Sequence, residues 1–302
     1  MNNTSLPDEI RKSYEWCREV TKRRARNFYF GIVLLPQARR DALCAIYAFF
    51  RECDDISDGA GVQNRRERLE HWKKVIKGEI AVPDSSHPGL PALRHATRKY
   101  HVDIQNYLDL IDGTIMDLDE FQVHTFEDMY RYCYHVASTV GLVCISVFGC
   151  ENRPEVRKMA EYHGIAFQIT NILRDIYHDA DEGRVYIPDD ILARFGLDRQ
   201  TILEKRGDEQ KMAALIKYIS AIAEDYYSKS EFLPCFINPQ SRLCLRAMTN
   251  IYYGLLKKIE QAGTGSLKQK VRLSLPEKLW AILRAYASTC IEYLYEIFAP
   301  GH

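Results

Sequence analysis

Three aspartates close an apolar stretch of the sequence and raise the question of what neutralises them. In FFRECDDISDGAG (49–61), Asp54, Asp55 and Asp58 follow directly on aromatic residues. If this segment is helical, Asp54 and Asp58 are four residues apart and share one face, where like charges repel by roughly 0.2–0.5 kcal/mol. The pattern therefore predicts a positively charged partner for these two carboxylates.

A second acidic stripe occurs in FQITNILRDIYHDADEGRVYIP (167–188). Asn171, Asp175 and Asp179 repeat at intervals of four residues, on a segment whose other side is apolar. A charged helix face is usually just solvated, but carboxylates on helices apolar enough to be buried need a cation or hydrogen-bond donors. Two such helices facing each other would offer oxygen ligands, which suit Mg²⁺, with Mn²⁺ as the alternative ion. We therefore expect a Mg²⁺–diphosphate cluster between the two stripes.

Basic side chains accompany both stripes. Arg51, Arg174 and Arg184 each lie within five residues of one of these aspartates. Because the arginine guanidinium binds phosphate oxygens bidentately, we expect these three residues to contact the diphosphate. The cluster TKRRAR (21–26) adds four further cations, among which Lys22 and Arg23 are explained more simply as solvent-exposed charges.

The composition excludes several classes of protein. Lys plus Arg equals Asp plus Glu at 41 each, which argues against a nucleic-acid-binding protein, since such proteins carry a basic excess. The nine cysteines contain no C-x-x-C pair, so we expect reduced thiols in a cytoplasmic protein rather than disulfides or a zinc site. The longest apolar runs, at 42–50 and 140–149, are shorter than the roughly 20 residues of a membrane helix. We expect a soluble protein whose membrane contact, if any, is peripheral.

Helical periodicity dominates the sequence, and the alternation typical of strands is nearly absent. The pattern predicts one all-α domain over residues 1–302, with its core at about 12–290 and loops at 78–91 and 261–269. The expected helices lie near 8–25, 37–58, 63–78, 103–119, 126–149, 153–180, 208–232, 239–261 and 276–297.

Several long motifs resemble the squalene/phytoene synthase family, the head-to-head trans-prenyltransferases. They are LLPQARRDALCAIYAFFRECDDISD, YCYHVASTVG, FQITNILRDIYHDADEGRVYIP and VRLSLPEKLW. The resemblance covers nearly the whole chain and implies the isoprenoid synthase fold, in which helices surround a central catalytic cavity. Two positions depart from the family pattern: Ser138 replaces the usual Gly, and Asn27 stands where many members have Ser.

The resemblance also assigns residues to roles. The implied metal ligands are Asp54, Asp58, Asn171, Asp175 and Asp179, with Asp55 as a weaker candidate. The implied catalytic residues are Tyr47, Arg51, Tyr132, Arg174 and Arg184. The implied substrate contacts are Arg26, Asn27, Phe28, Val136, Ala137, Gln168 and Tyr252. Asp112 and Asp117 fall near acidic positions of relatives and are expected to support the site indirectly.

The reaction implied by the resemblance joins two allylic prenyl diphosphates. Diphosphate leaves one molecule with the help of Mg²⁺, the C2–C3 double bond of the second attacks the allylic cation, and proton loss closes a cyclopropane. FRECDDISD and VRLSLPEKLW look closer to bacterial squalene-pathway members, so we expect two farnesyl diphosphates (C15) to give presqualene diphosphate or a squalene-type product. The alternative is a phytoene synthase acting on two geranylgeranyl diphosphates (C20). The sequence does not indicate NADPH use or the oligomeric state.

Two other functions fit parts of the pattern. A terpene cyclase shares the all-α fold and paired metal motifs, but cyclases usually carry N-x-x-x-S-x-x-x-E where residues 171–179 are N-x-x-x-D-x-x-x-D. A non-catalytic family member acting as an assembly factor would have lost acidic ligands, whereas all five principal positions are intact here.

Overall fold

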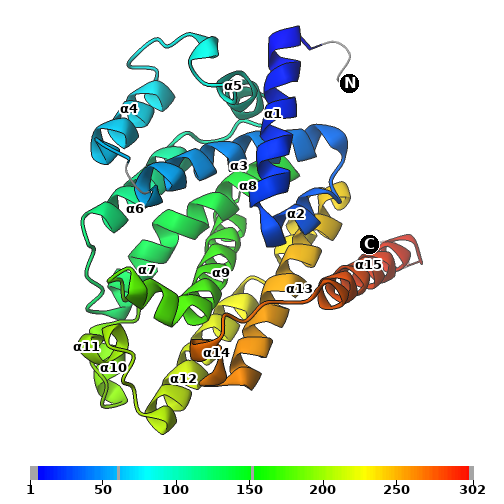
Figure 1. Cartoon of the computed structure of the whole chain (residues 1–302). Coiled ribbons are helices and arrows are strands. Elements are labelled where there is room, and N and C mark those ends of the chain that lie inside the picture. The colour runs from blue at the N-terminus through cyan, green and yellow to red at the C-terminus, as the bar shows by residue number, and fades with distance from the viewer. Residues whose placement is uncertain (1–5, 60–61, 151–152, 299–302) are drawn as a thin grey trace.

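The computed structural model describes the backbone of residues 6–59, 62–150 and 153–298, and the side chains of this part except Arg26 and 294–298. Within these ranges it contains helices and no strand (Figure 1). The α-helices are α1 (Asp8–Arg24), α2 (Arg26–Ile32), α3 (Gln37–Asp58), α4 (Arg65–Lys77), α5 (Leu90–Lys99), α6 (Gln105–Leu118), α7 (Phe126–Cys133), α8 (Thr139–Phe148), α9 (Pro154–Asp181), α10 (Asp189–Arg194), α11 (Arg199–Leu203), α12 (Glu209–Lys229), α13 (Pro239–Ala262), α14 (Gly265–Lys268) and α15 (Leu275–Phe298). The shorter elements are η2 (Asp84–Ser86), the π-helical turn η3 (Tyr134–Ser138) and η4 (Leu233–Phe236).

The all-α prediction is confirmed, and the nine expected helices appear with ends shifted by at most three residues. The segment expected as one helix at 126–149 is α7, η3 and α8 in succession. The short helices α2, α5, α10, α11 and α14 were not expected, and α14 lies inside the expected loop 261–269. Elements of four to ten residues carry too few turns to show a periodic pattern and depend on tertiary packing.

Helix α9 runs through the middle of the molecule (Figure 1) and packs against α12, η3, α8 and α13. Its buried side chains include Ile169, Ile172, Leu173 and Ile176, which recur at the three- and four-residue spacing of one helical face. Helix α3 packs against α1, α5, α6 and α8. The core packing of these two helices fixes the positions of their polar faces.

The stretch Phe126–Phe148 is long and apolar enough by composition to cross a membrane, and half of it is buried inside the structure. It lies between α6 and α9 and faces the interior, which explains its apolar character. A side chain at Gly141 would meet the Ala160 carbonyl oxygen at 2.8 Å, and one at Gly164 would meet the Ser138 backbone at 2.5 Å. Small residues therefore let this segment pack closely on α9, and the π-helical turn η3 interrupts its α-helical path.

Candidate active site

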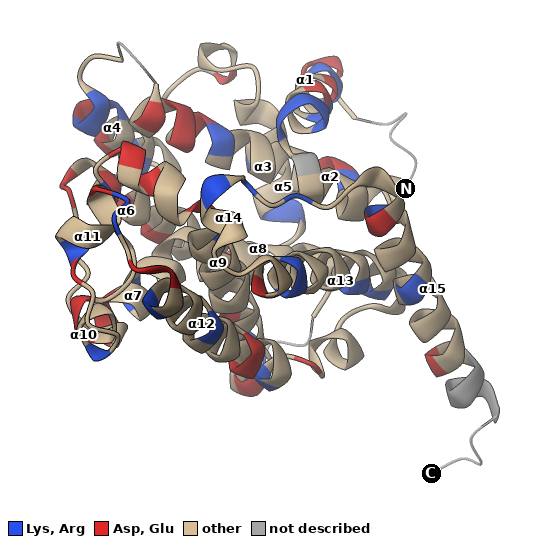
Figure 2. Cartoon of the chain, turned by 60° about the horizontal axis from the view of Figure 1, so that its bottom comes forward, with Lys and Arg blue, Asp and Glu red and all other residues tan. Residues whose placement is uncertain are grey.

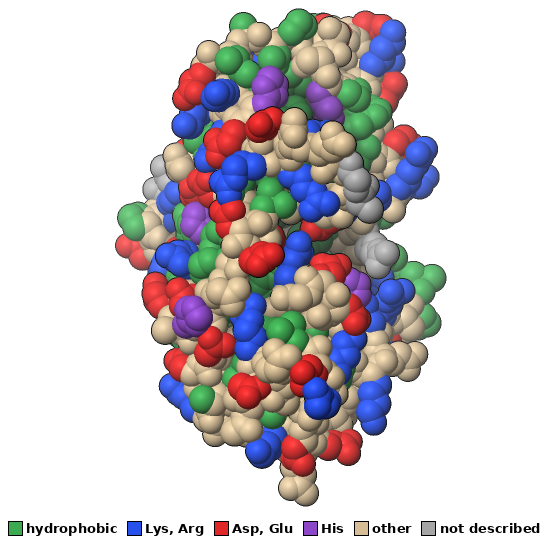
Figure 3. Space-filling model, turned by 60° about the vertical axis from the view of Figure 1, so that its left-hand side comes forward, with side chains coloured by type: hydrophobic (Ala, Val, Ile, Leu, Met, Phe, Trp, Pro, Cys, Tyr) green, Lys and Arg blue, Asp and Glu red, His purple; other side chains and the backbone are tan. Residues whose placement is uncertain are grey.

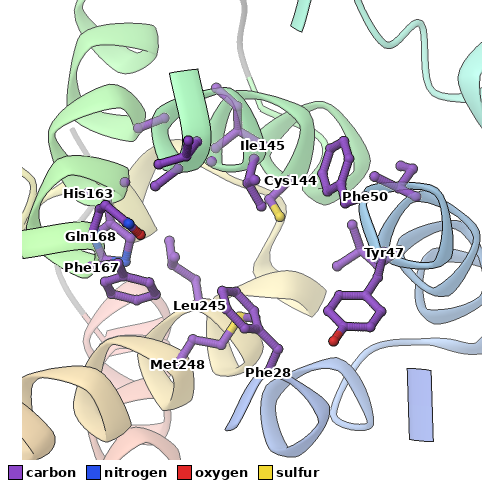
Figure 4. Close-up of a pocket in the computed structure, with 18 of the residues that line it drawn as sticks. Phe28, Tyr47, Phe50, Cys144, Ile145, His163, Phe167, Gln168, Leu245 and Met248 are labelled. Atoms are coloured by element: carbon purple, nitrogen blue, oxygen red, sulfur yellow. The ribbon is translucent and has the colours of Figure 1, made fainter. Parts of the chain in front are cut away.

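Two adjoining chambers lie between α3 and α9, and α8 lines one of them. The polar chamber, about 470 Å³, is lined mainly by charged and hydroxyl-bearing side chains. The apolar chamber, about 280 Å³, is lined mainly by aliphatic and aromatic side chains (Figure 4). The two chambers share five lining residues, namely Asp54, Leu110, Val136, Gln168 and Asn171. A molecule with a charged head and a hydrocarbon tail could therefore place one end in each chamber.

The two predicted acidic stripes both line the polar chamber. Asp54 and Asp58 come from the end of α3, and Asn171, Asp175 and Asp179 come from the facing side of α9. The side chain of Asp54 is 50% exposed, but the space it faces is the chamber. Burial within the protein raises the pKa of Asp54 to about 7, with repulsion from Asp58 adding to the shift and Arg51 opposing it. Burial, with repulsion from Asp175 next, likewise raises the pKa of Asp179 to about 7.

These elevated pKa values mean that the protein alone supplies too little positive charge to offset the burial of the Asp54 and Asp179 carboxylates. Asp175 is the contrast: burial acts to raise its pKa, but the hydrogen bonds from Arg174 and Lys270 outweigh that and hold the pKa below its usual range. A cation between the stripes would stabilise the ionised forms of Asp54 and Asp179, because an opposite charge nearby favours ionisation.

The polar atoms present fit a magnesium ion. Among the described residues, the buried side-chain oxygen of Asn171, Oδ1, has no hydrogen-bond partner, and neither has the hydroxyl of Ser57, which lines the same chamber. A buried acceptor without a partner is costly, so such an atom requires a ligand, an ion or water. In the described part of the chain, no three His, Cys, Asp or Glu side chains converge into a ready-made metal cluster. Two separated groups of oxygen ligands suit Mg²⁺, which keeps several waters and takes one or two carboxylates plus phosphate oxygens.

Basic side chains reach the same chamber from three elements. Arg51 on α3 contacts Asp55 through Nε at 2.8 Å, and its Nη1 lies 3.6 Å from Asp54. Arg184, in the loop after α9, places its Nη1 3.6 Å from Asp58 and so links the two acidic helices. The guanidinium of Arg174 donates hydrogen bonds to both oxygens of Asp175.

Lys270 is a fourth basic residue of this chamber, and sequence reasoning missed it. Its Nζ lies 2.7 Å from Oδ1 of Asp175. It belongs to the segment between α14 and α15 and is the residue of that segment that lines the polar chamber, while Leu273 of the same segment is buried against Gly254. The recognised motif VRLSLPEKLW begins at the next residue, Val271, so extending it by one position would have found Lys270.

A tyrosine pair forms another wall of the polar chamber. The rings of Tyr132 and Tyr186 stack at 4.4 Å, and both hydroxyls donate to Asp117, at 3.3 and 2.8 Å. Burial raises the pKa of Asp117, while these hydrogen bonds and Arg184 oppose the shift. Tyr186 was not predicted, and Asp117 holds both tyrosines in place. Asp112 lies outside both chambers, in an ion pair of 2.6 Å with Lys73.

The apolar chamber contains several predicted substrate contacts. Phe28, Tyr47, Val136, Ala137 and Gln168 line it, and Figure 4 shows Phe28, Tyr47 and Gln168 around the open space.

The remaining predicted contacts lie elsewhere. Tyr252 lines neither chamber but stacks on Phe167 at 4.1 Å and supports that wall from behind. Asn27 also lines neither chamber, because it lies on α2 outside the face that carries Phe28. The side chain of Arg26 is outside the described part of the structure.

Comparisons with known proteins identify this arrangement. The sequence profile of the squalene/phytoene synthase family matches residues 21–277. This chain belongs to the squalene/phytoene synthase family. It is 35% identical over 286 residues to a phytoene synthase of Mycobacterium tuberculosis, covering 93% of each chain. It is 32% identical to a 15-cis-phytoene synthase of Synechococcus elongatus, covering 90% of this chain and 92% of that protein.

Solved structures of this family have the same architecture. A dehydrosqualene synthase is 28% identical with a TM-score of 0.81, covering 93% of this chain and 97% of that one. The squalene synthase HpnC from Alicyclobacillus acidocaldarius is 25% identical with a TM-score of 0.77, covering 86% and 97%. Members of this family are prenyltransferases that condense prenyl diphosphates head to head, so this chain is a prenyltransferase of the squalene/phytoene synthase type.

Proposed function

We propose that this protein condenses two geranylgeranyl diphosphates head to head, in a Mg²⁺-dependent reaction that leads to phytoene. The observation that carries the proposal is the continuity of the polar and apolar chambers through Asp54, Gln168 and Asn171. A prenyl diphosphate is the kind of molecule that needs both environments at once. The C20 substrate is supported by the relatives named phytoene synthase, which share 32–35% of their residues with this chain.

The basic residues of the polar chamber would hold the diphosphates. Arg51, Arg184 and Lys270 approach it from three different elements, so the negative charge that develops on a departing diphosphate meets donors on more than one side. Mg²⁺, held by the carboxylates of α3 and α9 and by Asn171, would supply Lewis-acid stabilisation of that charge when bound.

The walls of the apolar chamber would protect the allylic cation. Loss of diphosphate leaves a cation on the prenyl chain, which the C2–C3 double bond of the second substrate attacks, with a proton lost when the cyclopropane closes. Aromatic rings such as Phe28 and Tyr47 offer π-faces to a cation and exclude water, which would otherwise trap it as an alcohol.

A second candidate keeps this chemistry but uses farnesyl diphosphate. The sequence motifs favoured that C15 substrate, and the solved structures of a dehydrosqualene synthase and a squalene synthase speak for it. The phytoene synthase relatives are more similar in sequence, so the C20 alternative is better supported. Family membership with all five acidic and amide positions intact also leaves the terpene cyclase and the non-catalytic assembly factor with little support.

The deciding experiment incubates the purified protein with Mg²⁺ and either diphosphate alone, with and without NADPH. Products are extracted and identified by mass. Phytoene from the C20 substrate, formed equally well without NADPH, is the expected result, because losing two diphosphates and two protons requires no reductant. Faster turnover of the C15 substrate would overturn the C20 assignment. A cyclic product from a single diphosphate would overturn the condensation itself.

A further inference from the structure

Helix α15 carries most of the exposed large hydrophobic side chains in the described part of the chain. Ten large hydrophobic side chains in the described part of the chain are exposed, and seven of these ten lie on α15. These seven are Leu275, Leu279, Trp280, Leu283, Tyr286, Ile291 and Tyr293, each 54–67% exposed. Single exposed hydrophobic residues are ordinary, but a contiguous group of this kind marks a surface that binds something.

The seven side chains form one face of the helix, which we call the outer face of α15. At 100° per residue they fall within an arc of about 160°. The opposite side is packed against α13: Ala281 and Ala285 are buried, and Nδ2 of Asn250 donates to the carbonyl oxygen of Ala281 at 3.0 Å. The helix is therefore seated by its small residues, and its large apolar ones point outward. Figure 1 shows α15 extending away from the rest of the molecule.

The free charge around the outer face is positive. Both acidic residues of α15 with described side chains are paired with basic residues of α13: Glu277 with Lys258 at 2.8 Å, and Glu292 with Arg246 at 2.7 Å. Lys268, Arg272 and Arg284 are exposed, and none of them has an ion pair within the described residues. Figure 2 shows α15 as largely uncharged with basic residues near its start. On another side of the molecule, acidic and basic residues are interspersed (Figure 3).

This charge distribution discriminates between two occupants. A second copy docked about a two-fold axis through the outer face would bring the same set of unpaired cations together, and like charges across an interface disfavour association. Anionic lipid headgroups would instead complement them, while the apolar side chains enter the acyl region and Trp280 and Tyr286 settle at the headgroup boundary that such rings prefer.

We propose that the outer face of α15 docks the protein on an anionic lipid bilayer. The position of the helix suits this role. The segment that leads into α15 contributes Lys270 to the lining of the polar chamber, and the ammonium of Lys278 lies 4.8 Å from the ring centre of Phe30 on α2. The same short helix carries Phe28 into the apolar chamber. Docking would thus hold the α2 side of the hydrocarbon-binding chamber beside the membrane, which matters because, under the proposed function, the product is a hydrocarbon.

The experiment is flotation of the purified protein with vesicles of equal parts phosphatidylcholine and phosphatidylglycerol, in the absence of substrate. The wild type is expected to float, and Trp280→Ser/Leu283→Ser/Tyr286→Ser is expected to partition at least about tenfold more weakly, because three apolar anchors are lost. Phe232→Ser is the matched control, since Phe232 is as exposed as Trp280, at 62%, but lies off the helix. It is expected to float like the wild type.

Arg272→Gln/Arg284→Gln is expected to weaken binding to these vesicles and leave binding to pure phosphatidylcholine unchanged.

Two further measurements separate the alternatives. Circular dichroism checks that each variant is folded, and sedimentation without lipid gives the oligomeric state. Flotation of the triple variant equal to that of the wild type would overturn the proposal. So would a wild type that fails to float, or a wild-type dimer that the triple variant converts to a monomer. Since flotation needs no substrate, these outcomes do not depend on whether the proposed reaction is correct.

Discussion

The ammonium of Lys270 lies 2.7 Å from the carboxylate of Asp175 and so bridges the segment before α15 to the acidic face of α9. Arg174 contacts the same carboxylate through both of its oxygens, which leaves Asp175 with two cationic partners. A diphosphate bound beside Asp175 would accept hydrogen bonds from the same lysine. Lys270 is thus placed to contribute to the electrostatics of the reaction as well as to hold the segment before α15 against α9.

We predict that Lys270→Met lowers kcat/KM about 10- to 100-fold. Methionine keeps much of the apolar stem but removes the charge, and a charge-assisted contact worth about 1.4–2.8 kcal/mol corresponds to this factor. The measurement is steady-state turnover in detergent. Lys268→Met is the control, because Lys268 is exposed and lines neither chamber. Equal loss in both variants would assign the effect to surface charge rather than to the contact with Asp175.

Asp54→Asn is predicted to abolish turnover and to raise the unfolding temperature of the metal-free protein. Asp54 and Asp58 are like charges on one helix face, so a neutral side chain of the same shape relieves repulsion while it removes a proposed metal ligand. Asp175→Asn is expected to abolish turnover but to lower the unfolding temperature, because it breaks contacts with Arg174 and Lys270. Activity close to wild type in both variants at saturating Mg²⁺ would refute the metal assignment.

The predicted metal requirement can be tested both by turnover and by thermal unfolding. The ligands proposed are carboxylate and amide oxygens, so Mg²⁺ or Mn²⁺ should restore activity after EDTA treatment and Zn²⁺ should not. In a thermal-unfolding assay, Mg²⁺ with inorganic diphosphate should stabilise the wild type by mass action and stabilise Asn171→Leu much less. Leucine matches asparagine in shape but lacks the oxygen Oδ1, which has no hydrogen-bond partner in the part of the chain that the structure describes. Activity that survives EDTA would contradict this assignment.

The sequence predicted the long helices and the two acidic stripes because both depend on local spacing. Asp54 and Asp58 on one helix, and Asn171, Asp175 and Asp179 on another, repeat every four residues, and the apolar remainder of each helix determines which way the stripe faces. Lys270 and Tyr186 could not be predicted in this way, since both lie in irregular segments where no period indicates the direction of a side chain. Their places in the site follow from how those segments pack.

The apolar chamber was predictable in kind but not in detail. Phe28 and Ala137 line it as expected, whereas Tyr252 lies behind the wall that Phe167 forms. The difference depends on the rotation of α13 against α9, which neighbouring side-chain volumes determine.

His163, also in the wall, is buried on α9 with one ring nitrogen 3.2 Å from the Ser230 hydroxyl and the other 3.2 Å from that of Thr249. Nothing in the sequence set it apart from the other histidines.

Because His163 is buried, we predict that the free energy of unfolding falls in acid. Burial lowers the pKa of its imidazole from 6.5 to about 4 in the folded state, so the unfolded chain binds more protons at intermediate pH. Above about pH 6.5 the protonation of His163 therefore does not lower the free energy of unfolding. As the pH falls toward 4, this free energy decreases, by about 2 kcal/mol between pH 7 and pH 5. The measurement is the free energy of unfolding at both pH values for the wild type and His163→Gln. The wild type should lose more stability than the variant by about that amount. Equal losses would show that His163 is not the group responsible.

Chain-length preference gives the sharpest test of the apolar chamber. Phe28 lines this chamber, and the centre of its ring lies 5.5 Å from the ring centre of Tyr252. Phe28→Ala should therefore lengthen the space for the tail and raise turnover of the C20 diphosphate relative to the C15 diphosphate. Ala137→Leu should fill the chamber and shift the ratio the other way. Gly141 is unsuitable for this purpose, because any side chain there meets the Ala160 backbone.

The size of the shift follows from burial. Each methylene gained in the chamber is worth about 0.8 kcal/mol, so accommodating even two more carbons changes relative binding about tenfold. Phe28→Ala also costs stability, up to about 3–5 kcal/mol for a fully buried ring and less for this half-buried one. Each variant is therefore checked by circular dichroism before the ratio is compared. Opposite shifts in the two variants would place the tail in this chamber, whereas an unchanged ratio in both would mean that residues elsewhere limit its length.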